Sequence, residues 1–158
     1  MSGPSTLAGS LSDLHPRPMD TDRNGLQILD ETECLALVAS ATLGRVAISS
    51  GALPTILPIN YRLVDRTVLF RTGRGTKLDA ATANAVVAFE VDDFDPVEHT
   101  GWSVNLIGVA RDLETVLCDL TFDVTEIPRW APTGDERVVA VTAELITGRR
   151  IRHDLAQV

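Results

Sequence analysis

Two strand-like runs separated by a very short connection most constrain the fold of this chain. The runs "TILPINYRLV" (Thr55–Val64) and "TVLFRT" (Thr67–Thr72) are rich in β-branched and aliphatic residues, and only Asp65 and Arg66 lie between them. A parallel pair needs a crossover connection of about a dozen residues or more. The two runs therefore predict an antiparallel hairpin. A third run, Arg45–Ser49, precedes them across an equally turn-like "SGALP" and extends the predicted meander.

Three later segments continue this pattern. They are Val86–Phe94, Gly101–Glu114 and Arg137–Ile151. Gly108 lies in the middle of one of them, where a bulge or a close backbone approach is expected. Six or more strands in sequential hairpins, with a few short helices, predict a mainly β fold in the form of a closed or nearly closed antiparallel barrel. Closure removes the exposed edges that so long a sheet would otherwise present.

Three segments favour helices. Asp30, with Glu33 three residues later, has the spacing of a capping box, and Gly44 suits a position just past the end of the helix that follows. A second short helix is expected at Thr76–Asn84. The segment 115–127, "TVLCDLTFDVTEI", is ambiguous between helix and strand and is interpreted as mostly helical.

Length and charge bound the function. A chain of 158 residues corresponds to about one domain. Its formal net charge of −8 argues against nucleic-acid and anionic-membrane partners, because the overall field repels phosphate. No apolar run approaches the length of about 20 residues that spans a bilayer. We expect a cytoplasmic protein with a flexible N-terminal arm, residues 1–24, and a single domain over residues 25–158.

A cluster of positively charged residues is unusual in a chain with this acidic composition. The stretch "FRTGRGTKLDAA" (Phe70–Ala81) contains the only lysine of the chain, Lys77, together with Arg71 and Arg74. It is not a Walker A loop, since threonine precedes the lysine, and a leucine stands at the third glycine position of a dinucleotide-binding loop. Any anion site here must therefore rest on local chemistry.

That local chemistry suits a phosphate. Gly75 allows a tight turn, Thr76 can cap the following helix, and Arg71 and Lys77 offer hydrogen bonds to phosphate oxygens. The alternative is a solvated turn whose basic residues offset nearby carboxylates such as Asp79. The residues alone leave both readings open.

Three ordered stretches carry a family resemblance. "TILPINY" (Thr55–Tyr61), "FRTGRGTKLDAA" and "VAFEVDDFDPVEHTGWSVNLIG" (Val87–Gly108) resemble, in order and spacing, the short actinobacterial-type members of the pyridoxamine 5′-phosphate oxidase-like flavoproteins. The resemblance runs from about Leu29 to Asp112. It implies a split β-barrel homodimer with FMN bound in grooves at the dimer interface.

The resemblance also implies roles for particular residues. Those expected at the FMN phosphate are Arg71, Thr72, Gly75, Thr76 and Lys77. Those expected along the isoalloxazine ring are Pro58, Ile59 and Asn60. Those expected to approach the flavin, from their own subunit or from the other one, are Trp102 and Ser103, with Trp130 and Arg137 as weaker candidates for closing the site.

The function implied is an FMN-dependent oxidoreductase that passes hydride or electrons to a small conjugated acceptor. The alternatives are a deazaflavin-dependent reductase, or a flavin- or haem-binding module without turnover. No catalytic side chain is identified, because the flavin itself would carry the chemistry. His15, His99 and His153 lack metal-ligand spacing, so no metal site is expected.

Overall fold

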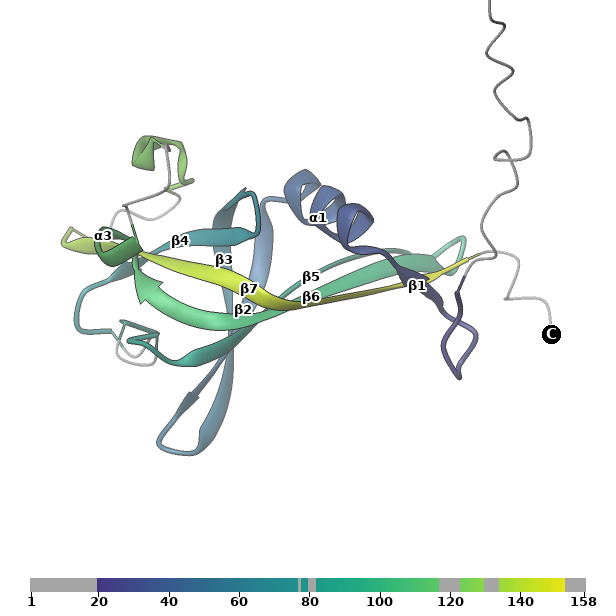
Figure 1. Ribbon diagram of the computed structural model, residues 1–158, viewed down its shortest axis with the longest axis horizontal. Coiled ribbons are helices and arrows are strands. Elements are labelled where there is room, and N and C mark those ends of the chain that lie inside the picture. The colour runs from purple at the N-terminus through teal and green to yellow at the C-terminus, as the bar shows by residue number, and fades with distance from the viewer. Residues whose placement is uncertain (1–19, 77, 80–81, 117–122, 130–133, 153–158) are drawn as a thin grey trace, which may run out of the picture.

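The computed structural model describes residues 20–152, except for residues 77, 80–81, 117–122 and 130–133 (Figure 1). Its sheet contains seven strands: β1 (Gln27–Leu29), β2 (Leu43–Ser50), β3 (Leu53–Val64), β4 (Thr67–Gly73), β5 (Val86–Asp95), β6 (Thr100–Asp112) and β7 (Glu136–Ile151). Every strand pairing is antiparallel. The short connections β2–β3, β3–β4 and β5–β6 account for three of these pairings, since they leave no room for parallel crossovers.

Six of these strands form a closed ring. The order is β7-β4-β3-β2-β5-β6, and β6 pairs back onto β7, while β1 adds to β7 from outside. The prediction of a mainly β, closed antiparallel barrel is confirmed. Closure leaves no free edge within the ring.

Strand β7 has two halves with different partners. Its first half, from Glu136 to Thr142, pairs with β4 on one side, and residues of the same half pair with the end of β6 on the other. Its second half pairs with the start of β6 and with β1. The register between β6 and β7 shifts between Ile107 and Gly108, which confirms the bulge expected at this glycine. The second half of β7 and the start of β6 extend away from the barrel, toward the right of Figure 1.

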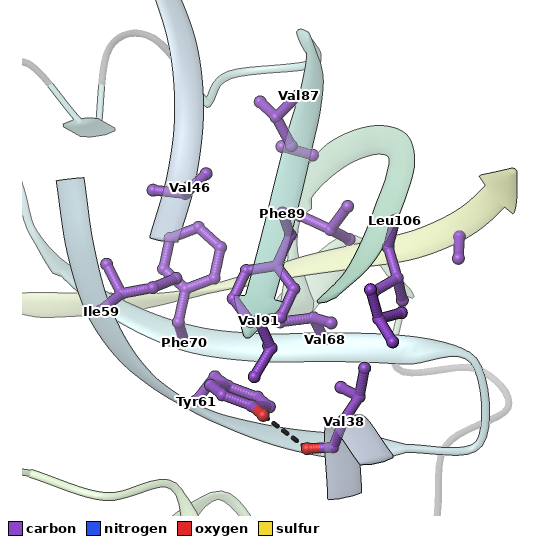
Figure 2. Packing of buried hydrophobic residues seen from close by; sticks show 14 of the residues in the cluster. Val38, Val46, Ile59, Tyr61, Val68, Phe70, Val87, Phe89, Val91 and Leu106 are labelled. Carbon is purple, nitrogen blue, oxygen red and sulfur yellow. Dashed lines mark hydrogen bonds between the residues drawn. The ribbon is translucent and has the colours of Figure 1, made fainter. Parts of the chain in front are cut away.

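The core fills the barrel (Figure 2). Val87, Phe89 and Val91 alternate inward from β5, as their spacing predicts. The rings of Tyr61 and Phe89 meet edge to face with their centroids 4.7 Å apart. The Tyr61 hydroxyl donates a hydrogen bond to the carbonyl oxygen of Val38, and burial raises the pKa of this hydroxyl, so it acts as a neutral donor. This bond ties helix α1 to the barrel.

Helix α1 (Glu31–Ser40) begins as the sequence predicts but ends earlier. The Asp30 side chain accepts a hydrogen bond of 2.8 Å from the Glu33 amide, which confirms the N-cap. The prediction that Gly44 ends this helix is wrong. The helix ends at Ser40, and Gly44 lies in β2, where an added Cβ would lie 2.3 Å from the Phe89 ring. A glycine is needed there because of packing, not because of a helix terminus.

The remaining short elements flank β6 and β7. Within the segment 115–127, the structure has the end of helix α3 (Leu113–Val116) and the 3-10 turn η2 (Val124–Glu126), while residues 117–122 lie outside the described part. Residues 78–79 are helical in the predicted second helix. Residues 20–24, assigned above to the arm, form a turn in which the Asp22 carboxylate accepts hydrogen bonds from the amides of Asn24 and Leu26. None of the helices in the described ranges is long and apolar enough to cross a membrane.

Candidate functional site

A cavity of about 370 Å³ opens where β3, β4 and the start of β7 meet. Six of the residues predicted to bind a cofactor line this cavity: Pro58, Ile59, Asn60, Arg71, Thr72 and Thr76. They come from two stretches of sequence, one predicted to hold a flavin ring and the other a phosphate. The fold therefore places both predicted sets in a single cavity.

Strand register explains why the two stretches converge. Tyr61 of β3 pairs with Phe70 of β4, so Asn60 and Arg71 lie next to one another just beyond this pair. Tyr61 and Phe70 are buried in the core, and the alternation of side chains along a strand turns their neighbours to the opposite face. The same hairpin that anchors the core thus delivers polar groups to the cavity.

Three charged side chains meet in the cavity. The carboxylate of Glu136 lies 3.8 Å from the Arg71 guanidinium and 3.3 Å from Nε of Arg129. The side chains of Glu136 and Arg71 are 7% and 17% exposed, whereas that of Arg129 is 54% exposed. The two arginines attract an anion, and Glu136 offsets part of their charge.

Asn60 presents a polar atom to the same space. Its Oδ1 atom is buried and has no hydrogen-bond partner among the residues that the structure describes. Buried amide oxygens are normally paired, so an unpaired one in a cavity wall suits a ligand that carries an N–H donor. The Asn60 side chain can therefore accept a hydrogen bond from the polar edge of a ligand.

The described residues of the segment 73–79, called the anion loop below, are connected by hydrogen bonds of their own. Gly75 has a φ of +76°, which favours glycine. Its amide donates to Oδ2 of Asp79 over 2.8 Å, and the Asp79 amide donates to Oγ1 of Thr76 over 3.1 Å, which confirms the capping role predicted for this threonine. The Thr72 and Thr76 hydroxyls are 3.1 Å apart and both line the cavity.

Other predicted residues lie elsewhere or outside the described part. Arg74 forms an exposed ion pair with Asp135, with 3.3 Å between Nε and Oδ1. Arg137 is not among the described residues that line the cavity, and its guanidinium contacts Asp79, Thr82 and Asp112. Lys77 and Trp130 fall outside the described residues, so their predicted roles stay predictions.

Trp102 and Ser103 are not brought to the cavity within one protomer. They pair with Arg150 and Arg149 in the second half of β7. Glu136, in the cavity wall, is at the opposite end of the same strand. At about 3.3 Å per residue, positions 136 and 150 are separated by roughly 45 Å along the strand.

Sequence reasoning missed Arg129 and Glu136. Both come from the segment "PRWAPTGDERVV", far along the chain from the anion loop. Only the pairing of β7 with β4, in which Glu136 is opposite Gly73, brings them into the site. The one available signal was that this segment also contains Trp130 and Arg137, the weaker candidates that the family resemblance implied.

Comparison with known proteins agrees with the fold and the motifs. The uncharacterized protein Rv0080 of Mycobacterium tuberculosis is 36% identical over 138 residues, which cover 80% of this chain and 86% of that protein. The structure of the FAD binding protein from Mycobacterium smegmatis is 39% identical with a TM-score of 0.62, over 80% of this chain and 99% of that one. A conserved protein of unknown function from Corynebacterium diphtheriae, DIP1874, is 30% identical with a TM-score of 0.61, over 80% and 98%.

The family assignment follows from the sequence as a whole. The family described as pyridoxamine 5′-phosphate oxidase matches residues 30–150, which include the strands of the barrel ring except the last residue of β7, and all the described residues that line the cavity. The resemblance inferred from the three motifs is thereby confirmed. The chain belongs to the pyridoxamine 5′-phosphate oxidase family.

Proposed function

We propose that this protein binds a flavin mononucleotide in the cavity between β3, β4 and β7. The observation that carries the proposal is the meeting of two complementary sets of groups in one cavity. Arg71, Thr72 and Thr76 offer a guanidinium and two hydroxyls to a phosphate. Pro58 offers an exposed apolar surface and Asn60 an unpaired acceptor to a flat ring with an N–H edge.

Charge favours a mononucleotide over a cofactor with a longer anionic tail. Among the described residues that line the cavity, Arg71 and Arg129 are positive and Glu136 is negative. This balance suits one phosphate better than the several negative charges of a deazaflavin tail. FAD is the second candidate, because the relative from Mycobacterium smegmatis that is 39% identical is an FAD binding protein.

We further propose that the bound flavin makes the protein an oxidoreductase acting on a small conjugated acceptor. When bound, the flavin supplies hydride or electron transfer. The chain's own groups hold and orient it: Arg71 and the two threonine hydroxyls fix the phosphate, and Asn60 fixes the ring edge. No histidine or cysteine is among the described residues that line the cavity, so within that part of the chain no such side chain is placed to act as an acid or base there.

A homodimer is part of the proposal. One row of side chains runs across the outer face of five strands in direct cross-strand register: Ile56, Ala47, Ala88, Ile107 and Leu145. The large members of this row are exposed, with Ile56 at 69%, Ile107 at 38% and Leu145 at 51%. A row of exposed apolar side chains favours an interface. A second copy packed there can bring Trp102 and Ser103 to a flavin that they do not reach within their own protomer.

The test is spectroscopic and then kinetic. The purified protein is titrated with FMN, FAD and riboflavin, and each dissociation constant is measured from quenching of flavin fluorescence. We expect FMN to bind more tightly than riboflavin. A protein that binds none of the three contradicts the proposed function. Consumption of NAD(P)H with a quinone or nitroaromatic acceptor then supports an oxidoreductase, whereas a flavin that no reductant reduces supports a binding module.

A further inference from the structure

The guanidinium of Arg137 is the hub of a buried polar cluster beside the cavity. Its side chain is 9% exposed. Nε is ion-paired with Oδ1 of Asp79, and one terminal nitrogen donates to the Asp79 carbonyl oxygen over 2.7 Å and to Oγ1 of Thr82 over 3.2 Å. The other terminal nitrogen lies 3.5 Å from Oδ2 of Asp112. Arg137, in β7, is thus connected to the end of β6 through Asp112, to the anion loop through Asp79, and to Thr82 after the loop.

Asp79 links Arg137 to the other residues of the anion loop by hydrogen bonds. Its carboxylate uses Oδ1 for Arg137 and Oδ2 for the amide of Gly75. Its own amide donates to Thr76, whose hydroxyl is 3.1 Å from that of Thr72. A continuous series of hydrogen bonds therefore runs from Arg137 to two hydroxyls in the cavity wall.

Arg137 itself is not placed to bind the cofactor. It is absent from the described lining of the cavity, and its charge is offset by Asp79 and Asp112. Arg71, by contrast, lines the cavity. The two arginines are therefore suited to different roles. Arg71 can contact a ligand in the cavity, whereas Arg137 contacts the residues that position the ligand-binding groups.

We propose that Arg137 is a positioning residue that fixes the anion loop through Asp79 and so determines how strongly the site prefers a phosphorylated flavin over an unphosphorylated one. This inference rests on the proposed function. Without Arg137, the Thr72 and Thr76 hydroxyls lose their fixed orientation, while the ring-binding wall from Pro58 to Asn60 keeps its support from β3. The loss then affects the phosphate and leaves the ring contacts in place.

The experiment compares FMN and riboflavin in matched variants. The variants are Arg137→Ala, Arg137→Lys and Asp79→Asn, and the control is Arg62→Ala, which removes an exposed ion pair with Glu126 on the barrel surface. For Arg137→Ala we expect FMN affinity to fall by about tenfold or more, because a charge-assisted bond and its network are lost. Riboflavin affinity is expected to stay within about twofold of that of the parent. In the control, the affinities for FMN and for riboflavin are both expected to stay within the same limit.

Two conservative variants test whether the geometry of the Arg137–Asp79 ion pair matters in addition to its charge. Arg137→Lys keeps the charge but not the planar fork, so we expect an intermediate loss of FMN affinity. Asp79→Asn keeps the side-chain shape and removes the ion pair. We expect its FMN affinity to fall, as in Arg137→Ala, while its riboflavin affinity stays nearly unchanged. This variant replaces Arg137→Ala if circular dichroism shows that the latter does not fold.

Two outcomes overturn the positioning role. Equal loss of FMN and riboflavin means that Arg137 supports the whole fold, and unchanged affinity for both means that the loop does not depend on it. A parent protein that binds neither flavin contradicts the proposed function instead. Hydrogen exchange remains informative in that case, since Arg137→Ala is expected to lose protection at the Gly75 and Asp79 amides while the β3 and β4 amides keep theirs.

Discussion

One carboxylate oxygen of Glu136 lies between two guanidinium groups, 3.8 Å from a terminal nitrogen of Arg71 and 3.3 Å from Nε of Arg129. The side chains of Glu136 and Arg71 are 7% and 17% exposed, so solvent screens their interaction only weakly, whereas Arg129 is 54% exposed and its ion pair is screened more strongly. A ligand phosphate in the cavity shares its attraction to Arg71 with a fixed negative group. This arrangement lowers the affinity of the site for anions and limits the charge that it accepts.

Glu136→Gln is therefore expected to strengthen binding of FMN. Removing one negative charge near the phosphate raises its affinity by about three- to tenfold at the effective dielectric of a partly buried site. Riboflavin carries no phosphate and is expected to bind unchanged. Titration of both ligands into parent and variant provides the measurement. Weaker FMN binding would instead assign Glu136 to holding Arg71 in place.

Lys77→Ala and Arg74→Ala test the charges predicted from the basic stretch. Lys77→Ala is expected to weaken FMN binding by about 1–3 kcal/mol, as for loss of a charge-assisted hydrogen bond. Arg74→Ala is expected to change it by less than about twofold, because this side chain forms an exposed ion pair with Asp135. Isothermal titration with FMN measures both. Equal losses would indicate a broad anion patch in place of a defined phosphate site.

A double variant of the apolar row tests the dimer. Ile107→Glu combined with Leu145→Glu places two charges on the outer face of the sheet, where burial against a second copy is unfavourable. We expect sedimentation to give the dimer mass for the parent and the monomer mass for the variant, with FMN affinity reduced in the variant. Val97→Glu, at a position that is 82% exposed in the turn after β5, is the control. A monomeric parent would contradict the dimer directly.

Gly108→Ala tests the close approach of β6 and β7. An added Cβ would lie 2.1 Å from the Thr142 carbonyl oxygen, and because this atom belongs to the backbone of β7 it has little freedom to move away. We expect the free energy of unfolding to fall by about 2–4 kcal/mol, measured by urea denaturation. Asn105→Ala, an exposed position on the same strand, is expected to stay within about 0.5 kcal/mol of the parent. A neutral Gly108→Ala would mean that the strands separate readily.

The ion pair of Asp79 makes a prediction about pH. The hydrogen bonds from Arg137 and from the Gly75 amide hold the pKa of the Asp79 carboxyl below its usual value. A carboxyl with a lowered folded pKa stabilises the fold fully above its unfolded pKa of about 3.9, and this contribution is lost as the pH falls through the folded value. The difference in melting temperature between the parent and Asp79→Asn is therefore expected to be constant from pH 7 to about pH 5 and to shrink below about pH 4. A difference that instead grows on acidification would contradict the assignment.

Local patterns predicted the strands well because each strand alternates or is bounded by turns. The β3–β4 hairpin, the Asp30 cap and the bulge at Gly108 all follow from short stretches of sequence. The convergence of Asn60 and Arg71 also follows, once the hairpin between them is recognised. For such features the relevant physics acts over a few residues.

Features set by distant pairings could not be predicted in this way. Gly44 carries a typical helix-stop signal, yet its role is to admit the Phe89 ring from another strand. Glu136 and Arg129 enter the cavity only through the pairing of β7 with β4. Nothing in their local sequence indicates which end of the barrel they will reach, because that depends on how the ring closes.

Ring closure by β7 also has a consequence for how the protein is made. Until residues from Glu136 onward leave the ribosome, β4 and β6 are both unpaired edges and the core between them stays open. Nearly all contacts of β7 join positions far apart in the chain, and such contacts form slowly. After β6 has emerged and until β7 is added, the nascent chain therefore exposes two unpaired strand edges, and only the pairing of β7 protects both edges from aggregation.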